Sequence, residues 1–260
     1  MSSPCPSRTA LGVYKGMDSI LVIENLTKLY KNGRGVKNIN ITVNRGDVVG
    51  LLGPNGSGKT TIMKTVMGMC HAGSGKVTIF GTDVEEDVEK ALGKVGGLIE
   101  RPAIYEYLSA YDNLKMMARF YPGVDDARIE HVMNIVRIGR YAKEKTGRFS
   151  LGMKQRLGIA MAILSEPELV VLDEPTNGLD IEGTVEIREI IKRLAAEKGV
   201  SFLVASHLAP EIEKMCNKVA IVHEGELLSY ETMEEALRLS PSLEDYFLTK
   251  VKDKRGTIII

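Results

Sequence analysis

The residues whose types and spacing could do chemistry are concentrated at positions 53–60. They fit the pattern G-x-x-x-x-G-K-[ST] of phosphate-binding loops, between an apolar run at 48–52 and apolar residues at helical spacing that follow. Glycines let such a loop curl until several N–H groups point into one hollow, and the next helix adds the positive end of its dipole. The stretch therefore predicts a site for nucleotide phosphates.

The side chains of this loop have separate expected tasks. Lys59 is placed to neutralise the β and γ phosphates, and the Thr60 hydroxyl is placed to ligate Mg²⁺. The alternative is a glycine-rich turn whose lysine faces solvent, which the flanking strand and helix patterns disfavour. The residues expected to contact the nucleotide here are Gly53, Pro54, Asn55, Gly56, Ser57, Gly58, Lys59, Thr60 and Thr61.

An acidic pair, Asp173 and Glu174, follows the apolar run at 169–172. Sites in open α/β sheets cluster at the carboxyl ends of strands, which is where this run would deliver both carboxylates. Asp173 is expected in the Mg²⁺ shell, because this ion prefers oxygen ligands. Glu174 is expected to polarise the attacking water or accept its proton. A solvated strand end is the alternative, and the loop upstream argues against it.

The composition is that of an ordinary globular chain. Of 260 residues, 44% are hydrophobic and 26% charged, and 34 basic residues balance 34 acidic ones. This zero net charge argues against nucleic acid as an electrostatic partner. Three scattered cysteines indicate free thiols in a reducing compartment. No run approaches the ~20 apolar residues of a membrane-spanning helix, so we expect a cytoplasmic protein.

Periodicity predicts an α/β fold interrupted by a helical segment. Residues 1–16 read as a disordered extension, with Met17 as a candidate natural start. Residues 101–148 carry helical patterns and no convincing strand, whereas strand–helix alternation resumes after them. The expected strands are 20–26, 36–43, 48–52, 75–80, 169–172, 201–205, 219–222 and 227–229, and the expected helices after the insertion are 153–164, 182–197, 210–216 and 231–239.

A second candidate anion site begins at Ser150, although a serine and glycine at a helix start also read as a simple cap. With the stretches above, it resembles the signature L-S-G-G-Q-x-Q-R of ABC transporter nucleotide-binding subunits, over roughly residues 17–230. The positions that match are Ser150, Gly152, Gln155 and Arg156, and those that depart are Phe149, Leu151 and Met153. The resemblance implies that Ser150 and Gly152 contact ATP held by the opposite subunit.

Other positions match that family in the expected order. Tyr30 corresponds to the aromatic residue that stacks on adenine, although a lone tyrosine in a turn is often structural. Asp180 belongs to the segment that crosses the dimer interface. His207 resembles the switch histidine that touches the γ-phosphate. The resemblance therefore implies that Glu174, His207 and Lys59 form the catalytic set, with ATP and Mg²⁺ as cofactors.

The informative departure is Glu100, where most members of this family carry glutamine. That glutamine senses Mg²⁺ and the attacking water, and it links the site to the membrane subunit. A glutamate there is similar to the branch for bacitracin resistance and lantibiotic immunity. A carboxylate adds negative charge near Mg²⁺, which strengthens ligation but repels the γ-phosphate. We therefore expect Thr60, Asp173 and Glu100 around the metal; the alternative is an exposed Glu100.

The fold class implied is a P-loop NTPase of the ABC type, with an antiparallel β subdomain and an inserted helical subdomain. We expect the ATPase domain at 17–240, its helical subdomain at about 101–155, and a C-terminal tail at 241–260. The expected partners are a second ATPase subunit, as a homodimer or a paired subunit, and an integral membrane permease at the inner face of the membrane. The expected function is ATP hydrolysis that drives an exporter.

Two rival functions compete with this one. A soluble ABC ATPase of translation or DNA repair would carry two joined domains or long coiled-coil insertions, and this chain has neither. A regulator that binds ATP without turnover would have no need of Asp173, Glu174 and His207, which are all present. The transported substrate is a property of the permease and does not follow from this chain.

Replacing Lys59 with alanine should abolish ATP binding, because the phosphates lose their main fixed positive charge. Equilibrium titration with labelled ATP measures this, with thermal unfolding of the nucleotide-free variant as the check on its folding. Affinity within a few-fold of the parent would contradict the assignment of the loop.

Overall fold

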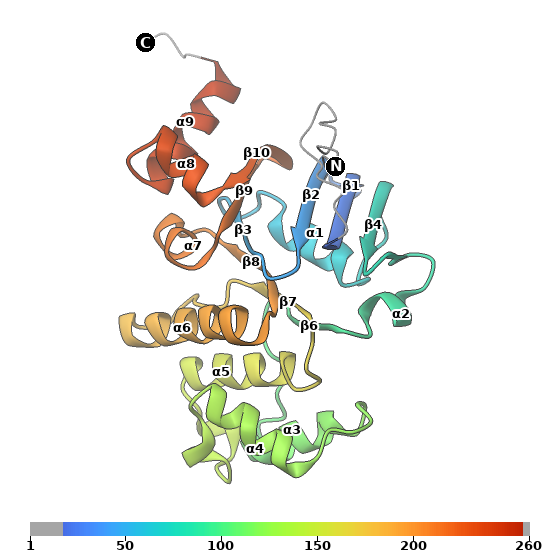
Figure 1. Ribbon diagram of the computed structural model, residues 1–260, viewed down its shortest axis with the longest axis vertical. Helices are drawn as coiled ribbons and strands as arrows, with labels where there is room; N and C mark the ends of the chain where they lie inside the picture. The colour runs from blue at the N-terminus through green and yellow to red at the C-terminus, as the bar shows by residue number, and fades with distance from the viewer. Residues whose placement is uncertain (1–17, 257–260) are drawn as a thin grey trace, which may run out of the picture.

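Two β-sheets organise the part of the chain that the computed structural model describes, residues 18–256 (Figure 1). A four-stranded antiparallel sheet has the order β2-β1-β4-β5, and a six-stranded sheet has the order β10-β9-β3-β8-β7-β6. The extension expected at 1–16 lies outside the described residues. The strands are β1 (Ser19–Leu29), β2 (Gly35–Asn44), β3 (Val48–Leu52), β4 (Ser74–Ile79), β5 (Thr82–Asp83), β6 (Val95–Leu98), β7 (Leu169–Asp173), β8 (Ser201–Ser206), β9 (Lys218–His223) and β10 (Glu226–Thr232).

The central strands of the larger sheet are parallel and buried on both faces. Strands β9, β3, β8, β7 and β6 run parallel, and only β10 pairs antiparallel. Every residue of β3, β7 and β8 is buried, which explains their unbroken apolar runs. Alternate residues enter two separate cores. Helix α1 (Lys59–Val66) contributes Ile62, Met63 and Val66 to the core between the sheets.

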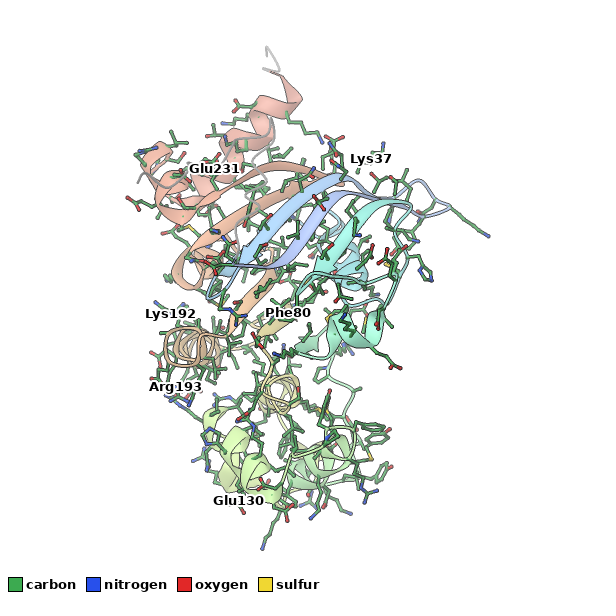
Figure 2. The ribbon with its side chains drawn as sticks, turned by 45° about the vertical axis from the view of Figure 1, so that its right-hand side comes forward. Lys37, Phe80, Glu130, Lys192, Arg193 and Glu231 are labelled. Carbon is green, nitrogen blue, oxygen red and sulfur yellow. The ribbon has the colours of Figure 1, made fainter. Side chains whose placement is uncertain are left out.

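Helix α2 contributes Ala91 to the core between the sheets, and the other core, on the opposite face of the larger sheet, holds helices α3 to α9. A helical subdomain with α3, α4 and the start of α5 occupies one end of the molecule, α8 and α9 lie at the other end beside β10, and α7 packs against β3 and β8 between them (Figure 1). Figure 2 shows Glu130 on α4 and Glu231 on β10 at these two ends. The helices besides α1 are α2 (Val88–Leu92), α3 (Ala110–Ala118), α4 (Asp126–Ile135), α5 (Leu151–Ala162), α6 (Ile181–Lys198), α7 (Ala209–Met215), α8 (Met233–Leu239) and α9 (Leu243–Arg255), with short 3₁₀ turns at Gly139–Tyr141 and Thr146–Arg148.

Most expected elements form within a few residues of their predicted bounds. Residues 101–148 contain helices and one isolated β-bridge, between Ser109 and Lys145. The stretch from 241, which we expected to be a tail, contains α9, and its Leu243 and Tyr246 are fully packed in the larger core. None of the helices within residues 18–256 has the length and apolar character needed to cross a bilayer.

Strand β6 is one of the elements that sequence patterns missed. Its two glycines, Gly96 and Gly97, have low strand propensity and conceal the pattern. They are needed because a Cβ at Gly96 would lie 1.8 Å from the Ala162 carbonyl oxygen at the end of α5. A Cβ at Gly97 would lie 2.6 Å from the Met67 side chain. Close approach of neighbouring elements therefore selects glycine in this strand at the edge of the larger sheet.

Substituting Gly96 with alanine should destabilise the fold by about 1–3 kcal/mol, because the added methyl group overlaps a backbone atom that cannot rotate away. Urea denaturation measures the loss. Gly93→Ala is the matched control, since a Cβ there meets its nearest neighbour at an ordinary 3.4 Å. Equal stability of the two variants would contradict this packing.

Candidate nucleotide site

Four adjacent strands deliver the candidate site residues to one edge of the larger sheet. In the order β3-β8-β7-β6, the phosphate loop follows β3, His207 follows β8, and Glu174 follows β7. Glu100 comes two residues after β6. Because these strands are parallel, their carboxyl ends meet at the same edge, so four segments distant in sequence come together there. The segments after β3, β7 and β6 line one pocket, whereas His207 lines another.

The conformation of the phosphate loop depends on its glycines. A Cβ at Gly53 would lie 2.0 Å from the Val222 carbonyl oxygen, so only glycine lets the loop pass β9. Gly58 has φ 112°, a region that side chains disfavour, and it directly precedes the first residue of α1. It brings no side chain to accept hydrogen bonds from the first turn of α1. Those N–H groups are therefore available to an anion.

The Lys59 ammonium lies inside this loop with its side chain only 6% exposed. Its Nζ donates to the carbonyl oxygens of Gly53 at 2.7 Å and Pro54 at 3.2 Å. It also lies 3.4 Å from Oε1 of Glu174. A buried cation needs such partners, because leaving it unpaired would cost several kcal/mol. Phosphate oxygens can replace them, since they accept hydrogen bonds as the carbonyl oxygens do and carry negative charge as Glu174 does.

Thr60 and Asp173 form the part of the site that fits a divalent cation. The Thr60 hydroxyl donates to Oδ2 of Asp173 at 2.8 Å, while the buried Oδ1 has no hydrogen-bond partner. Burial raises the pKa of Asp173, the Thr60 hydrogen bond opposes that rise, and the nearby Glu174 carboxylate adds to it. A cation would relieve this unfavourable burial of negative charge.

The chain supplies few metal ligands by itself. Among residues 18–256 no three or more His, Cys, Asp or Glu side chains are grouped to hold an ion. This agrees with the habit of Mg²⁺ at phosphate sites, where one or two protein oxygens act together with substrate phosphates and waters. Thr60 and Asp173 are the pair that fits this arrangement.

Glu174 has the geometry of an oriented base. Its Oε2 lies 2.8 Å from Nδ1 of His207, and its Oε1 faces Lys59. The backbone of Glu174 is left-handed, with φ 50°, an uncommon conformation that tends to occur at functional sites. With its side chain 20% exposed, the carboxylate is held from two sides yet can be reached by water. It can therefore polarise a water molecule or accept its proton.

Glu100 also lies at the pocket, but its carboxylate points to a different cation. Its Oε1 lies 2.6 Å from Nζ of Lys64, and the side chain is 61% exposed. The hydrogen bond to Glu100 raises the pKa of Lys64. The backbone at Glu100 is left-handed, with φ 62°. The side chain of Glu100 is thus exposed, as the alternative predicted. It is nevertheless paired with Lys64 and lies at the pocket.

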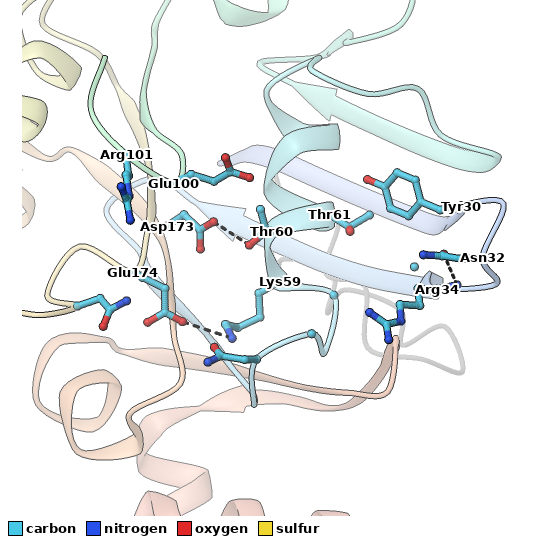
Figure 3. Close-up of a pocket in the computed structure, with 15 residues that line it drawn as sticks. Tyr30, Asn32, Arg34, Lys59, Thr60, Thr61, Glu100, Arg101, Asp173 and Glu174 are labelled. Carbon is cyan, nitrogen blue, oxygen red and sulfur yellow. Dashed lines mark hydrogen bonds and ion pairs between the residues drawn. The ribbon is translucent and has the colours of Figure 1, made fainter. Parts of the chain in front are cut away.

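Lys59, Thr60, Asp173, Glu174 and Glu100 line one pocket of about 470 Å³ (Figure 3). Tyr30 lies at the end of the pocket opposite Glu174, with Thr61 between it and the acidic residues. This separation suits a nucleotide whose adenine lies beside Tyr30 and whose triphosphate extends toward Glu174. Sequence analysis missed four polar lining residues, which are Asn32, Arg34, Arg101 and Asn177. The only feature of the sequence that could have indicated them is that they are close in the chain to Tyr30, Glu100 and the acidic pair.

The signature residues do not join this pocket. Ser150, Gly152 and Asp180 line a separate one of about 650 Å³, together with Arg137 and Arg140. The Ser150 hydroxyl caps α5 by accepting from the Met153 N–H at 3.2 Å, as the simpler alternative for a serine at a helix start predicted. The Asp180 carboxylate caps α6. The predicted site residues of one chain therefore line separate pockets.

The geometry is accompanied by a family match. The model of a family described as "ABC transporter" matches residues 36–177, which include the phosphate loop and the acidic pair. This chain belongs to the ABC transporter family. The ABC ATPase fold, the phosphate-binding loop and the activity as a transport-coupled ATPase were thus predicted correctly from the sequence. The alternative of an ABC ATPase for translation or DNA repair is set aside.

Several characterised and solved ABC proteins are similar to the chain. It is 42% identical to the bacitracin transport ATP-binding protein BcrA of Bacillus licheniformis, over 82% of this chain and 69% of that protein. It is 38% identical to the lantibiotic transport ATP-binding protein SrtF of Streptococcus pyogenes, over 89% of this chain and 97% of that protein. A solved ATP-binding subunit of an ABC transporter superposes with a TM-score of 0.80 at 28% identity, covering 90% of this chain and 100% of that one.

Replacing Glu174 with glutamine should keep ATP binding but lower hydrolysis by about 10²–10⁴, the usual contribution of a general base. Gln keeps the shape of the side chain and can still meet His207. Single-turnover hydrolysis and ATP titration separate the two effects. Glu197→Gln, on the exposed face of α6, is the matched control. Normal hydrolysis in Glu174→Gln would remove this residue from the role of base.

Proposed function

We propose that this chain is the ATP-binding and hydrolysing subunit of an exporter whose permease is a separate membrane protein, and that the exported compounds are antimicrobial peptides such as bacitracin or lantibiotics. The observation that carries the proposal is the single pocket that joins Lys59, Thr60, Asp173 and Glu174. The similarity to proteins named for bacitracin and lantibiotic transport supports the substrate class. The proposed location is the inner face of the membrane, through the permease.

The residue roles follow from the contacts. Lys59 and the N–H groups of the loop hold the phosphates, and Tyr30 stacks on the adenine. Thr60 and Asp173 hold Mg²⁺, which supplies charge compensation for the phosphates when bound. Glu174 takes the proton of the attacking water, and His207, 2.8 Å from its carboxylate, keeps that carboxylate oriented and faces the γ-phosphate.

The separation of the two pockets supports a head-to-tail dimer. Within the described residues, Ser150 and Asp180 line a pocket separate from that of Lys59, although a signature residue must reach phosphate to act. A second copy turned end to end would bring its signature to this phosphate loop. Exposed apolar residues beside the signature, Leu151 and Ile181, suit burial in such a contact. ATP binding would close the dimer, and hydrolysis would open it.

The function is tested by resistance in cells. The chain and its permease, expressed together in a sensitive host, should raise the bacitracin or lantibiotic concentration needed to stop growth. The Glu174→Gln variant with the same permease is the control, because it should bind ATP but fail to turn over. Resistance that is equal with both variants, or absent with both despite ATP hydrolysis in vitro, would reject this substrate class.

The shared-site arrangement is tested by Ser150→Arg. The bulky cation should spare ATP binding to the monomer and abolish turnover, because it blocks the contact of the signature with the opposite nucleotide. Ser150→Ala controls for the lost helix cap, which by itself costs about 0.5–2 kcal/mol of stability. ATP titration, steady-state hydrolysis and size measurement with Mg-ATP report the outcome. Parent-level turnover in Ser150→Arg would reject the shared site.

A further inference from the structure

A second lysine of helix α1 forms an ion pair at the nucleotide pocket. Lys64 lies one helical turn beyond Thr60, and its Nζ is 2.6 Å from Oε1 of Glu100. The two side chains are 33% and 61% exposed, so solvent and ions reach the pair. The pair joins the helix that follows the phosphate loop to the segment that follows β6.

Each of the three carboxylates that line the pocket has a different partner. Glu174 faces the buried Lys59, Asp173 accepts from the Thr60 hydroxyl, and Glu100 pairs with Lys64. Lys59 is needed to bind the phosphates, and the Thr60 hydroxyl is neutral, so it does not cancel the negative charge of Asp173. Lys64 is therefore the cation that balances the added charge of Glu100.

We propose that Lys64 is a positioning residue that holds the Glu100 carboxylate until a divalent cation takes it, so that the competition between Lys64 and the cation sets the Mg²⁺ concentration that ATP binding requires. This inference rests on the proposed role of Glu100 in the Mg²⁺ shell.

The local geometry gives the competition its direction. Glu100 has a left-handed backbone, and it lines the same pocket as Thr60 and Asp173 while its carboxylate is turned to Lys64. A carboxylate that neutralises an ammonium attracts a second cation less strongly, and the ammonium itself repels that cation. An exposed ion pair contributes about 0.2–1 kcal/mol, which corresponds to a change of roughly 1.5- to 5-fold in cation affinity.

The test replaces Lys64 with glutamine and measures binding of a cation without turnover. Mn²⁺, which also prefers oxygen ligands, is titrated in the presence of the non-hydrolysable nucleotide adenylyl imidodiphosphate, and its free form is followed by electron paramagnetic resonance. Lys64→Gln should bind Mn²⁺ roughly 1.5- to 5-fold more tightly than the parent, whereas Lys64→Arg should behave like the parent. Lys192→Gln, exposed on α6 and away from the pocket lining (Figure 2), controls for loss of one positive charge.

A double substitution decides whether Lys64 acts through Glu100. Glu100→Gln alone should weaken Mn²⁺ binding, up to roughly ten- to a hundredfold if a charge-assisted contact worth ~1.5–3 kcal/mol is lost, and less if water fills the gap. In the Glu100→Gln background, Lys64→Gln should change Mn²⁺ affinity no more than Lys192→Gln does. Nucleotide affinity without a divalent cation is measured for each variant, so that a direct effect on the phosphates is recognised.

Three results would overturn the role of Lys64. They are unchanged Mn²⁺ binding in Lys64→Gln, weaker Mn²⁺ binding in that variant, and an equal gain in the Glu100→Gln background. If Glu100→Gln also leaves Mn²⁺ binding unchanged, the placement of Glu100 near the metal fails as well. The proposed ATPase function stands or falls separately, on nucleotide binding by Lys59→Ala and hydrolysis by Glu174→Gln.

Discussion

The close approach of the buried Lys59 ammonium to the half-buried carboxylate of Glu174, just after β7, is the constraint on which the rest of the structure depends. An ammonium with 6% exposure is tolerable only among carbonyl oxygens and a carboxylate, and all of these are within 3.4 Å of Lys59. Phosphates satisfy the same cation. The resting partners of Lys59 therefore resemble the ligand in charge, which keeps the loop folded in a shape ready for nucleotide.

The order of strands follows from that requirement. The phosphate loop leaves β3 and the acidic pair leaves β7, and β8 lies between them and places His207 beside Glu174. Two cores, one on each face of these strands, fix their spacing with apolar side chains alone. The polar and charged site residues are thereby confined to the strand ends, where water and ligand have access. Even the missed strand β6 serves this purpose, since it carries Glu100 to the same edge.

The second consequence of the fold is that the predicted site residues lie in separate pockets of one chain. Lys59, Thr60, Asp173 and Glu174 line one pocket, whereas Ser150 and Asp180 cap helices beside another. In the proposed dimer each nucleotide would be held by two chains, so closure and hydrolysis depend on both. Glu100 lies two residues after β6, in the connection between the larger sheet and the helical subdomain.

The sequence by itself determined the local chemistry of this protein. Glycine spacing before Lys59, and the apolar run before Asp173, predict loop and strand end because these features depend on neighbours in the chain. The glycine-rich strand β6, the packing of α9 and the pairing of Lys64 with Glu100 were decided only by tertiary structure. Each depends on atoms far apart in sequence, such as the Ala162 carbonyl oxygen beside Gly96, and contacts of that kind leave no periodic signal in the chain.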